Sequence, residues 1–187
     1  MKKELPRQAL HLIFGLIYIA LILFFGRMDA LLLISVIFFF GALLSWLAIK
    51  EIHLPFFRVI LEMVEREEEK HVPGKGALML TIGCLLALTI FSDEKVIVGS
   101  IIVLVFGDAV STLIGRLHGK TKLINHQKSF EGSLAFLIVS FVALMTFQLN
   151  WFIALSVALI GTITELAPID DNLTIPIVCG LALMILL

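Results

Sequence analysis

Long apolar runs alternate with short polar connections along the whole chain. Ala30–Ile49 contains 20 consecutive residues without a charged side chain, and a helix of that length matches the roughly 30 Å hydrocarbon core of a bilayer. Gln148 and Asn150 are the only polar residues between the fifth and sixth runs, so a tight hairpin is expected there. The pattern predicts seven apolar segments: Ala9–Phe25, Ala30–Ile49, Ala77–Phe91, Val96–Gly115, Ser133–Phe147, Trp151–Thr164 and Leu173–Leu187. We expect an all-α fold, a polytopic membrane helical bundle of about seven transmembrane helices, forming a single domain over residues 1–187.

The second polar connection has a helical pattern of its own. From residue 56 to residue 70, apolar residues recur at helical spacing opposite a charged face. We expect an amphipathic helix over about residues 55–70, lying at the cytoplasmic membrane interface. Glu62 and Arg66 stand in the i,i+4 order that favours an ion pair. The stretch Pro73-Gly74-Lys75-Gly76 is expected to end this segment and to lead into the third apolar run.

Composition supports the membrane interpretation. Hydrophobic residues make up 60% of the chain and charged residues 16%, with a mean hydropathy of +1.09. Soluble domains are usually about 45–50% apolar and about 25% charged. The net charge of −1 argues against a nucleic-acid partner. Cys84 and Cys179 lie inside apolar runs, so we expect small buried hydrophobic residues rather than a disulfide or a zinc site. The first run lacks a small-residue cleavage site and is expected to be a retained span.

Lysine and arginine are distributed unevenly between the two sides that seven crossings would create. The N-terminus and the second and fourth connections carry 12 of the 14 basic residues, and the opposite side carries only Arg27 and Lys95. Because basic residues concentrate in cytoplasmic loops, the N-terminus is expected inside. The protein would then lie in the plasma membrane of a prokaryote or the endoplasmic reticulum of a eukaryote, with its active site at the cytoplasmic face.

Asp108 is the clearest charged residue within an apolar run, and charges at such positions are costly and usually functional. At helical spacing it shares one face with Ser111 or Thr112, and with Gly115 and Gly119. A carboxylate, a hydroxyl and two glycines on one face are consistent with a binding site. Close helix packing also explains the glycines, and a structural ion pair would also explain Asp108.

The following loop, Gly115-Arg116-Leu117-His118-Gly119-Lys120-Thr121, combines glycines with cations. It is not a P-loop, because three residues separate its glycines where the Walker pattern needs four, and because a membrane helix precedes it. Its backbone N–H groups and cations nevertheless suit a polyphosphate. The fifth run then opens with Lys128-Ser129-Phe130-Glu131-Gly132, where Ser129 can cap the helix and Glu131 lies in its first turn.

The last connection contains three acids and no basic residue. Glu165, Asp170 and Asp171, with the amide of Asn172, offer oxygen ligands for a hard divalent cation, most plausibly Mg²⁺ bound together with phosphates. A solvated acidic turn is the alternative. The predicted topology brings these acids to the same membrane face as Asp108 and the basic loops. Acids that hold Mg²⁺ and cations that hold phosphate indicate a nucleotide site for phosphoryl transfer, with a lipid acceptor that arrives through the bilayer.

These residues resemble the dolichol kinase and phytol kinase family, which also includes CTP-dependent diacylglycerol kinases. The resemblance rests on Phe106-Gly107-Asp108-Ala109, Gly115, Gly119-Lys120, Lys128-Ser129-Phe130-Glu131-Gly132, and Glu165 with Asp170-Asp171-Asn172-Leu173-Thr174-Ile175-Pro176. It implies CTP as phosphoryl donor, a divalent cation, a long-chain lipid alcohol as acceptor, and the compact prokaryotic type of the family. It also implies that Asp108, Lys128, Glu131, Glu165, Asp170, Asp171 and Asn172 form the nucleotide and metal site, and that Gly115, Gly119 and Lys120 form the phosphate-facing turn.

The expected site therefore has four groups of residues. The expected catalytic residues are Asp108, Glu131 and Asp170. The expected Mg²⁺ ligands are Asp108, Glu165, Asp170 and Asp171. The residues expected at the nucleotide and its phosphates are Thr112, Gly115, Arg116, Gly119, Lys120, Lys128, Ser129, Gly132 and Asn172. His11, one turn before Gly15, either orients the acceptor headgroup or is a buried, satisfied histidine.

Three other functions stay open. Phosphatidate cytidylyltransferases, which make CDP-lipids, have a similar Gly-Asp and Lys-x-x-Glu-Gly style of motif, but their later His-Gly-Gly and Asp-Arg-x-Asp signature is absent here. A CTP-dependent diacylglycerol or phytol kinase would differ only in the acceptor. An ion-coupled transporter would use Asp108 and Glu165 as coupling carboxylates. Whether the chain forms a homo-oligomer also stays open.

Overall fold

The computed structural model describes residues 3–50, 52, 55–65, 71–123 and 128–187. These residues form helices and, apart from one isolated bridge between Lys122 and Ser129, no β-structure. The elements in chain order are α1 (Glu4–Ile49), α2 (Pro55–Val64), α3 (Lys75–Ile90), α4 (Glu94–Ile102), the π-helical turn η2 (Val103–Asp108), α5 (Ala109–His118), α6 (Phe130–Thr146), α7 (Trp151–Glu165) and α8 (Asp171–Leu186). The all-α prediction is confirmed, and each predicted apolar run is helical.

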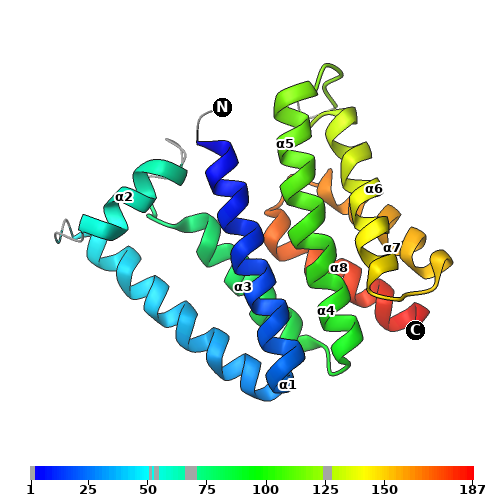
Figure 1. The fold of residues 1–187 in the computed structure, drawn as a ribbon, viewed down its shortest axis with the longest axis horizontal. Coiled ribbons are helices and arrows are strands. Elements are labelled where there is room, and N and C mark those ends of the chain that lie inside the picture. The colour runs from blue at the N-terminus through cyan, green and yellow to red at the C-terminus, as the bar shows by residue number, and fades with distance from the viewer. Residues whose placement is uncertain (1–2, 51, 53–54, 66–70, 124–127) are drawn as a thin grey trace.

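The first two apolar runs form one element, α1, with a sharp bend at Gly26. This glycine has a φ of 74° and a ψ of 172°, a backbone conformation that residues with a Cβ rarely adopt. The bend divides α1 into two arms that form a V (Figure 1). The Arg27 side chain fastens the bend to the end of α3, because its Nε donates to the carbonyl oxygen of Leu88 at 2.8 Å.

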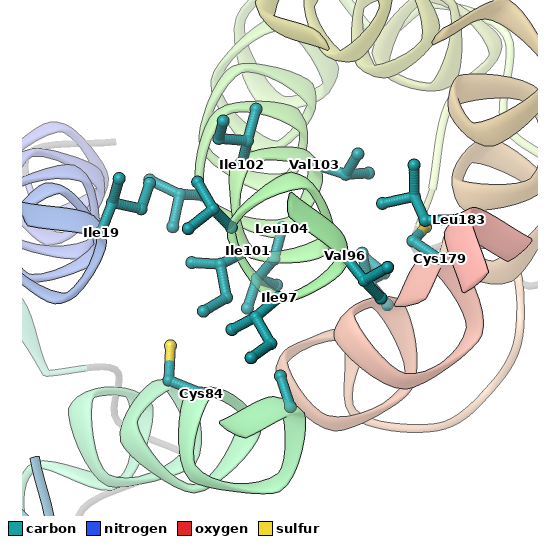
Figure 2. Packing of buried hydrophobic residues seen from close by; sticks show 14 of the residues in the cluster. Ile19, Cys84, Val96, Ile97, Ile101, Ile102, Val103, Leu104, Cys179 and Leu183 are labelled. Carbon is teal, nitrogen blue, oxygen red and sulfur yellow. The ribbon is translucent and has the colours of Figure 1, made fainter. Parts of the chain in front are cut away.

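The continuous helix α4–η2–α5 lies at the centre of the bundle. Ile97, Ile101 and Leu104 are fully buried in its apolar core. Figure 2 shows this helix flanked by α1 on one side, α3 on another and α8 on a third. Gly15 of α1 lies so close to Val105 that an added Cβ would collide with its side chain. The core thus holds α1 against the segment that carries Asp108.

The predicted hairpin between the fifth and sixth runs is present between α6 and α7. Gln148 adopts a positive φ of 62°, and Asn150 caps α7 by accepting a hydrogen bond from the N–H of Phe152 at 2.9 Å. The two helices consequently pack side by side (Figure 1). This short connection is what the two polar residues of the sequence indicated.

A helix is also present at the second connection, but it ends earlier than expected. The expected helix ran to about residue 70, whereas α2 ends at Val64; residues 66–70, and with them the expected Glu62–Arg66 pair, lie outside the described part of the chain. Glu62 instead pairs with Arg58 at 3.1 Å on the exposed face. The expected turn before the third run is confirmed, because Gly74 has a φ of 76° and α3 begins at Lys75.

Among the described residues, two elements are long and apolar enough to cross a membrane: α1, and the continuous helix from Glu94 to His118. The helices α3, α6, α7 and α8 are equally apolar but only 15–17 residues long. The second arm of α1 exposes a row of large apolar side chains, with Leu32 and Val36 each 66% and Phe39 70% exposed. Apolar surface of this extent is typical of contact with lipid or another protein. These features point to a membrane protein.

Candidate functional site

Asp108 is positioned by the π-helical turn η2, which ends at this residue. Such turns inside α-helices are frequently found at functional sites. Gly107 lies against Phe136 and Ser140, where a Cβ would come within 2.6–2.8 Å of their side chains. The Asp108 carboxylate accepts a hydrogen bond from Thr112 Oγ1 at 3.3 Å, through Oδ1. Its Oδ2 lies 4.0 Å from His11 Nε2, so the bundle places a carboxylate and an imidazole side by side.

Lys128 joins two acids from different helices. Its Nζ lies 2.6 Å from Asp171 Oδ2 at the start of α8 and 3.3 Å from Glu165 Oε1 at the end of α7. The Glu165 side chain is only 1% exposed. We call Asp108, Lys128, Glu165 and Asp171 the ionic cluster. Its members come from segments far apart in the sequence, and a nucleotide at this cluster stays a prediction.

Lys128 keeps its charge in this position. Burial lowers the pKa of the Lys128 ammonium, but the carboxylates of Asp171, Glu165 and Asp108 together raise it by more, so the pKa lies above its ordinary value. A lysine that stays protonated and lies among three carboxylates is a fixed cation. Its position suits contact with an anionic group that can compete with the carboxylates.

Ser111, one of the two hydroxyl residues expected on the helical face of Asp108, orients Glu165. Ser111 Oγ donates to Glu165 Oε1 at 2.5 Å, while Glu165 Oε2 is buried and has no partner among the described residues. Asp171 Oδ1 is likewise buried and has no hydrogen-bond partner among the described residues. Unpaired buried carboxylate oxygens are costly unless a ligand or cation satisfies them.

The four expected metal ligands do not together form a metal site. Within the described ranges, no three Asp, Glu, His or Cys side chains are arranged to hold a metal ion. Mg²⁺ is, however, usually bound by one or two carboxylates together with substrate phosphates and water. The unpaired oxygens of Glu165 and Asp171 fit that mode of binding.

Asp170 caps α8 rather than joining the Lys128 contacts. Its Oδ1 accepts from the backbone N–H of Asn172 at 3.1 Å and from the Asn172 side-chain amide at 3.0 Å. Pro176, one turn later, has no N–H to donate to the Asn172 carbonyl. That carbonyl instead lies directly against Gly83 of α3, where no Cβ could fit. The first turn of α8 is therefore fixed tightly beside the site.

Glu131 holds the loop between α5 and α6. Its carboxylate accepts from the N–H of Thr121 at 3.2 and 3.3 Å. Ser129 caps α6 as expected, since its Oγ accepts from the N–H of Gly132 at 3.1 Å. These contacts give both residues a structural role next to Lys128.

The expected phosphate-facing glycines lie where α5 and α6 touch. A Cβ on Gly132 would come within 2.9 Å of the Ser111 carbonyl oxygen and 3.2 Å of Gly115 Cα. Gly119 packs against Gly115 and Ser129. Close helix packing, the alternative recognised in the sequence, accounts for these glycines, and contact with phosphate stays a prediction. Of the nearby cations, Lys120 is exposed.

Pattern reasoning missed a polar stripe at the start of α1. Glu4 and Gln8 are only 5% and 2% exposed. Glu4 Oε2 forms an ion pair with Arg116 at 2.8 Å, and Glu4 Oε1 pairs with Arg7 at 3.0 Å. Arg116, expected at phosphate, thus also ties α5 to α1. The spacing of residues 4, 7, 8 and 11 on one helical face would have revealed this stripe.

The fold and site define an apolar helical protein with a largely buried ionic cluster. The chain is 34% identical over 178 residues to an uncharacterized protein of Methanocaldococcus jannaschii, covering 94% of this chain and 90% of that protein. It is 26% identical over 202 residues to Phytol kinase 1, chloroplastic, of Arabidopsis thaliana, covering 97% and 66%. It is 30% identical over 147 residues to Probable phytol kinase 1, chloroplastic, of Oryza sativa subsp. japonica, covering 68% and 47%.

The chain belongs to the phytol kinase family, being homologous to phytol kinases over nearly its whole length. The resemblance inferred from the motifs is thereby confirmed. The chain spans about half to two thirds of the length of these plant relatives. No family model and no solved structure matches the chain.

Proposed function

We propose that this protein is a kinase that transfers the γ-phosphoryl group of CTP to a long-chain lipid alcohol of the phytol or polyprenol class, at the cytoplasmic membrane face. The observation that carries the proposal is the contact of Lys128 with both Glu165 and Asp171, close to Asp108, in a chain homologous to phytol kinases. Phosphoryl transfer depends chiefly on positioning and charge neutralisation, and the ionic cluster offers both.

The proposed donor site uses the cations at this end of the bundle. Lys128 contacts the transferred phosphoryl group, while Lys120 and Arg116, with backbone N–H groups of the turn from Gly115 to Gly119, contact the remaining phosphates. Further contacts to the nucleotide come from Thr112, Ser129, Gly132 and Asn172. CTP rather than ATP follows from the family resemblance alone.

Mg²⁺ is the proposed cation, held by Glu165 and Asp171 through their unpaired oxygens, with Asp108 and Asp170 as further carboxylates of the site. When bound, it neutralises charge on the donor phosphates. Ser111 holds Glu165 in a fixed orientation, and Asn172 holds Asp170.

In the proposed reaction, the alcohol oxygen attacks the γ-phosphorus of CTP. An O–P bond forms, the bond from the γ-phosphorus to the β,γ-bridging oxygen breaks, CDP leaves, and the hydroxyl proton passes to a carboxylate. Asp108, Glu131 and Asp170 are the candidate acceptors of that proton. Contacts favour Asp108 over Glu131, since both oxygens of Glu131 accept from the N–H of Thr121, whereas Thr112 bonds only Oδ1 of Asp108 among the described residues.

The proposed topology has an inside N-terminus and seven crossings, with the two arms of α1 counted separately and α2 lying at the interface. It places the loop before α6 and the connection before α8 at the cytoplasmic face, beside the N-terminus. A lipid acceptor then reaches the site from the membrane, and CTP reaches it from the cytoplasm.

The test is a transfer assay with purified protein in lipid nanodiscs, Mg²⁺, and CTP labelled at either the γ- or the α-phosphate. Phytol, a polyprenol and diacylglycerol serve as acceptors. The proposal expects γ-label in the lipid and no α-label. Incorporation of α-label would instead identify a cytidylyltransferase, and the absence of both labels would contradict any transferase.

Asp108→Asn supplies the specific control of this assay. The substitution is expected to reduce transfer by about 100-fold or more. Asp29→Asn, at an exposed position next to the bend of α1, is expected to leave transfer unchanged. Full activity of a well-folded Asp108→Asn protein would refute the assignment of this carboxylate.

A further inference from the structure

A cavity of about 100 Å³ lies beside Asp108, between the starts of α1 and α3 and the end of α2. Its walls are mainly apolar and are formed by Leu10 and Phe14 of α1, Leu61 and Val64 of α2, and Leu80 of α3. Its polar lining includes Gln8, His11, Asp108 and Asn172, and the charged residues Arg7, Glu65 and Lys75 also line it. We call this space the α1–α3 pocket.

Three polar atoms in the lining of the pocket lack partners. Gln8 Oε1, His11 Nε2 and Asn172 Oδ1 are buried and form no hydrogen bond with any described residue. Gln8 is 98% buried as a residue, since only 2% of it is exposed. His11 Nε2 lies 4.0 Å from Asp108 Oδ2, too far for a direct hydrogen bond. Buried polar atoms without partners are costly, and a bound hydroxyl group, with one donor hydrogen and an acceptor oxygen, would satisfy part of this set.

The size of the pocket selects among the substrates. Sites for whole drug-sized ligands are roughly 300–1,000 Å³, so about 100 Å³ is too small for a nucleoside triphosphate. It is sufficient for a hydroxyl group and the first few carbons of a chain. An apolar wall with a polar end is complementary to an alcohol whose hydrocarbon part continues into lipid.

We propose that the α1–α3 pocket binds the acceptor alcohol, a claim that rests on the proposed kinase function. The hydroxyl group lies between His11 and Asp108, within reach of Gln8, and the hydrocarbon chain follows Phe14, Leu61 and Val64. The helix α2 forms one wall of the acceptor site and thereby contributes to selection of the alcohol.

This arrangement gives Asp108 a definite part in the reaction. Thr112 already occupies Asp108 Oδ1, which leaves Oδ2, the oxygen nearer His11, for the alcohol proton. The alcohol proton moves to Asp108 as the oxygen bonds to the γ-phosphorus and CDP departs. On the other side, Asp108 acts electrostatically on Lys128. Asp108 thus belongs both to the lining of the acceptor pocket and to the ionic cluster that would hold the donor phosphates.

Gly76 offers a way to fill the pocket without disturbing the helices. It lines the pocket in the first turn of α3, and a Cβ added there meets no atom within 4 Å. In nanodiscs, Gly76→Phe is expected to raise KM for the alcohol by about tenfold or more while leaving KM for CTP within about twofold. Ala9→Phe, which adds the same side chain to an exposed position of α1, is the matched control and should leave both values unchanged.

A second pair of variants tests the wall formed by α2. Val64 lines the pocket, whereas its neighbour Met63 is 56% exposed and does not. Val64→Trp is expected to raise KM for the alcohol and to shift the preference toward slimmer chains, and Met63→Trp is not. If wild-type protein transfers phosphate but Gly76→Phe and Val64→Trp leave KM for the alcohol unchanged, or alter KM for CTP instead, the pocket assignment is wrong.

Binding of the alcohol in the absence of CTP tests the pocket independently of the proposed kinase function. A long-chain alcohol with a diazirine beside its hydroxyl should label residues of α1 and α3 in wild-type protein, and Gly76→Phe should suppress that labelling. Labelling of the pocket in a protein that transfers no phosphate would support the pocket and refute the kinase. Labelling that is absent from the pocket, in a protein that does transfer phosphate, would refute the pocket alone.

Discussion

Lys128 Nζ lies 2.6 Å from Asp171 Oδ2, so a residue two positions before α6 is bound directly to the first residue of α8. The contact lies deep enough that burial opposes the charge on Lys128, and nearby carboxylates outweigh that effect. Buried ion pairs are often no more stable than apolar substitutes of similar shape, yet removal of one partner is strongly destabilising. The pair is therefore weak evidence for stability, and it is consistent with the role proposed for Lys128 at the donor phosphates.

Loss of the Lys128 charge should abolish phosphoryl transfer. Lys128→Met is expected to lower kcat by about 100-fold or more, because the cation proposed for the transferred phosphoryl group is gone. It should also reduce the free energy of unfolding by about 3–5 kcal/mol, because Asp171 and Glu165 lose their buried partner. Transfer assays and denaturant unfolding in mixed micelles measure the two effects.

Lys122→Met is the control for this variant, since Lys122 is an exposed lysine of the same loop. It should match wild type in both assays. Lys128→Arg keeps the charge and should retain more activity than Lys128→Met. A Lys128→Met protein with wild-type kcat would contradict the role of this residue at the donor phosphates.

The stability that Lys128 contributes should depend on pH in one direction. Its folded-state pKa lies above the ordinary lysine value of about 10.4, so its contribution is complete below that pH and is lost as pH rises through the folded-state pKa. The difference in unfolding free energy between wild type and Lys128→Met should therefore persist up to about pH 9 and shrink above about pH 10.4. A difference that shrinks between pH values of about 7 and 9 would show that Lys128 is not held in its charged form.

Ser111 should act as a positioning residue through Glu165. Ser111→Ala removes the 2.5 Å bond to Glu165 Oε1, and a hydrogen bond to a charged group is worth about 1.5–3 kcal/mol. We expect kcat to fall by about tenfold and the Mg²⁺ concentration for half-maximal activity to rise. Ser100→Ala is the matched control, because Ser100 is also buried but bonds only to Ile97 of its own helix. An unchanged Mg²⁺ dependence in Ser111→Ala would indicate that Glu165 does not hold the cation.

The apolar runs predicted the helices because length and hydropathy determine where a helix can be buried or face lipid. The same signal could not reveal η2, since α- and π-helical turns have similar apolar patterns and differ by tertiary packing. The sequence pattern also placed a break between the first two apolar runs. In the structure this break is a bend at Gly26, which has a positive φ, rather than a loop.

The site could be predicted only where chemistry is local in the sequence. Ser129 was expected as a helix cap and is one. Glu131 was expected as a catalytic residue, and that role stays a prediction. Its carboxylate accepts a hydrogen bond from the N–H of Thr121, a contact that depends on how the loop folds. The contacts of Lys128 with Glu165 and Asp171 join residues 37 and 43 positions apart, which no local pattern encodes. Charge asymmetry and the predicted topology supplied the missing step, because they assigned these residues to one membrane face.

The contact of Gly132 with Gly115 should be needed to place Lys128. In Gly132→Ala, the new Cβ would meet the Ser111 carbonyl oxygen at 2.9 Å, and backbone cannot move aside as a flexible side chain can. We expect α6 to shift away from α5, with a loss of about 1–3 kcal/mol in unfolding free energy and a fall in kcat, because Lys128 moves with the start of α6. Gly41→Ala is the control: its Cβ would meet only a Leu78 methyl at an ordinary 3.5 Å, and alanine favours the helix, so stability should rise by up to about 1 kcal/mol. If Gly132→Ala lowers stability but keeps kcat, the crossing of α5 and α6 supports the fold without setting the position of Lys128.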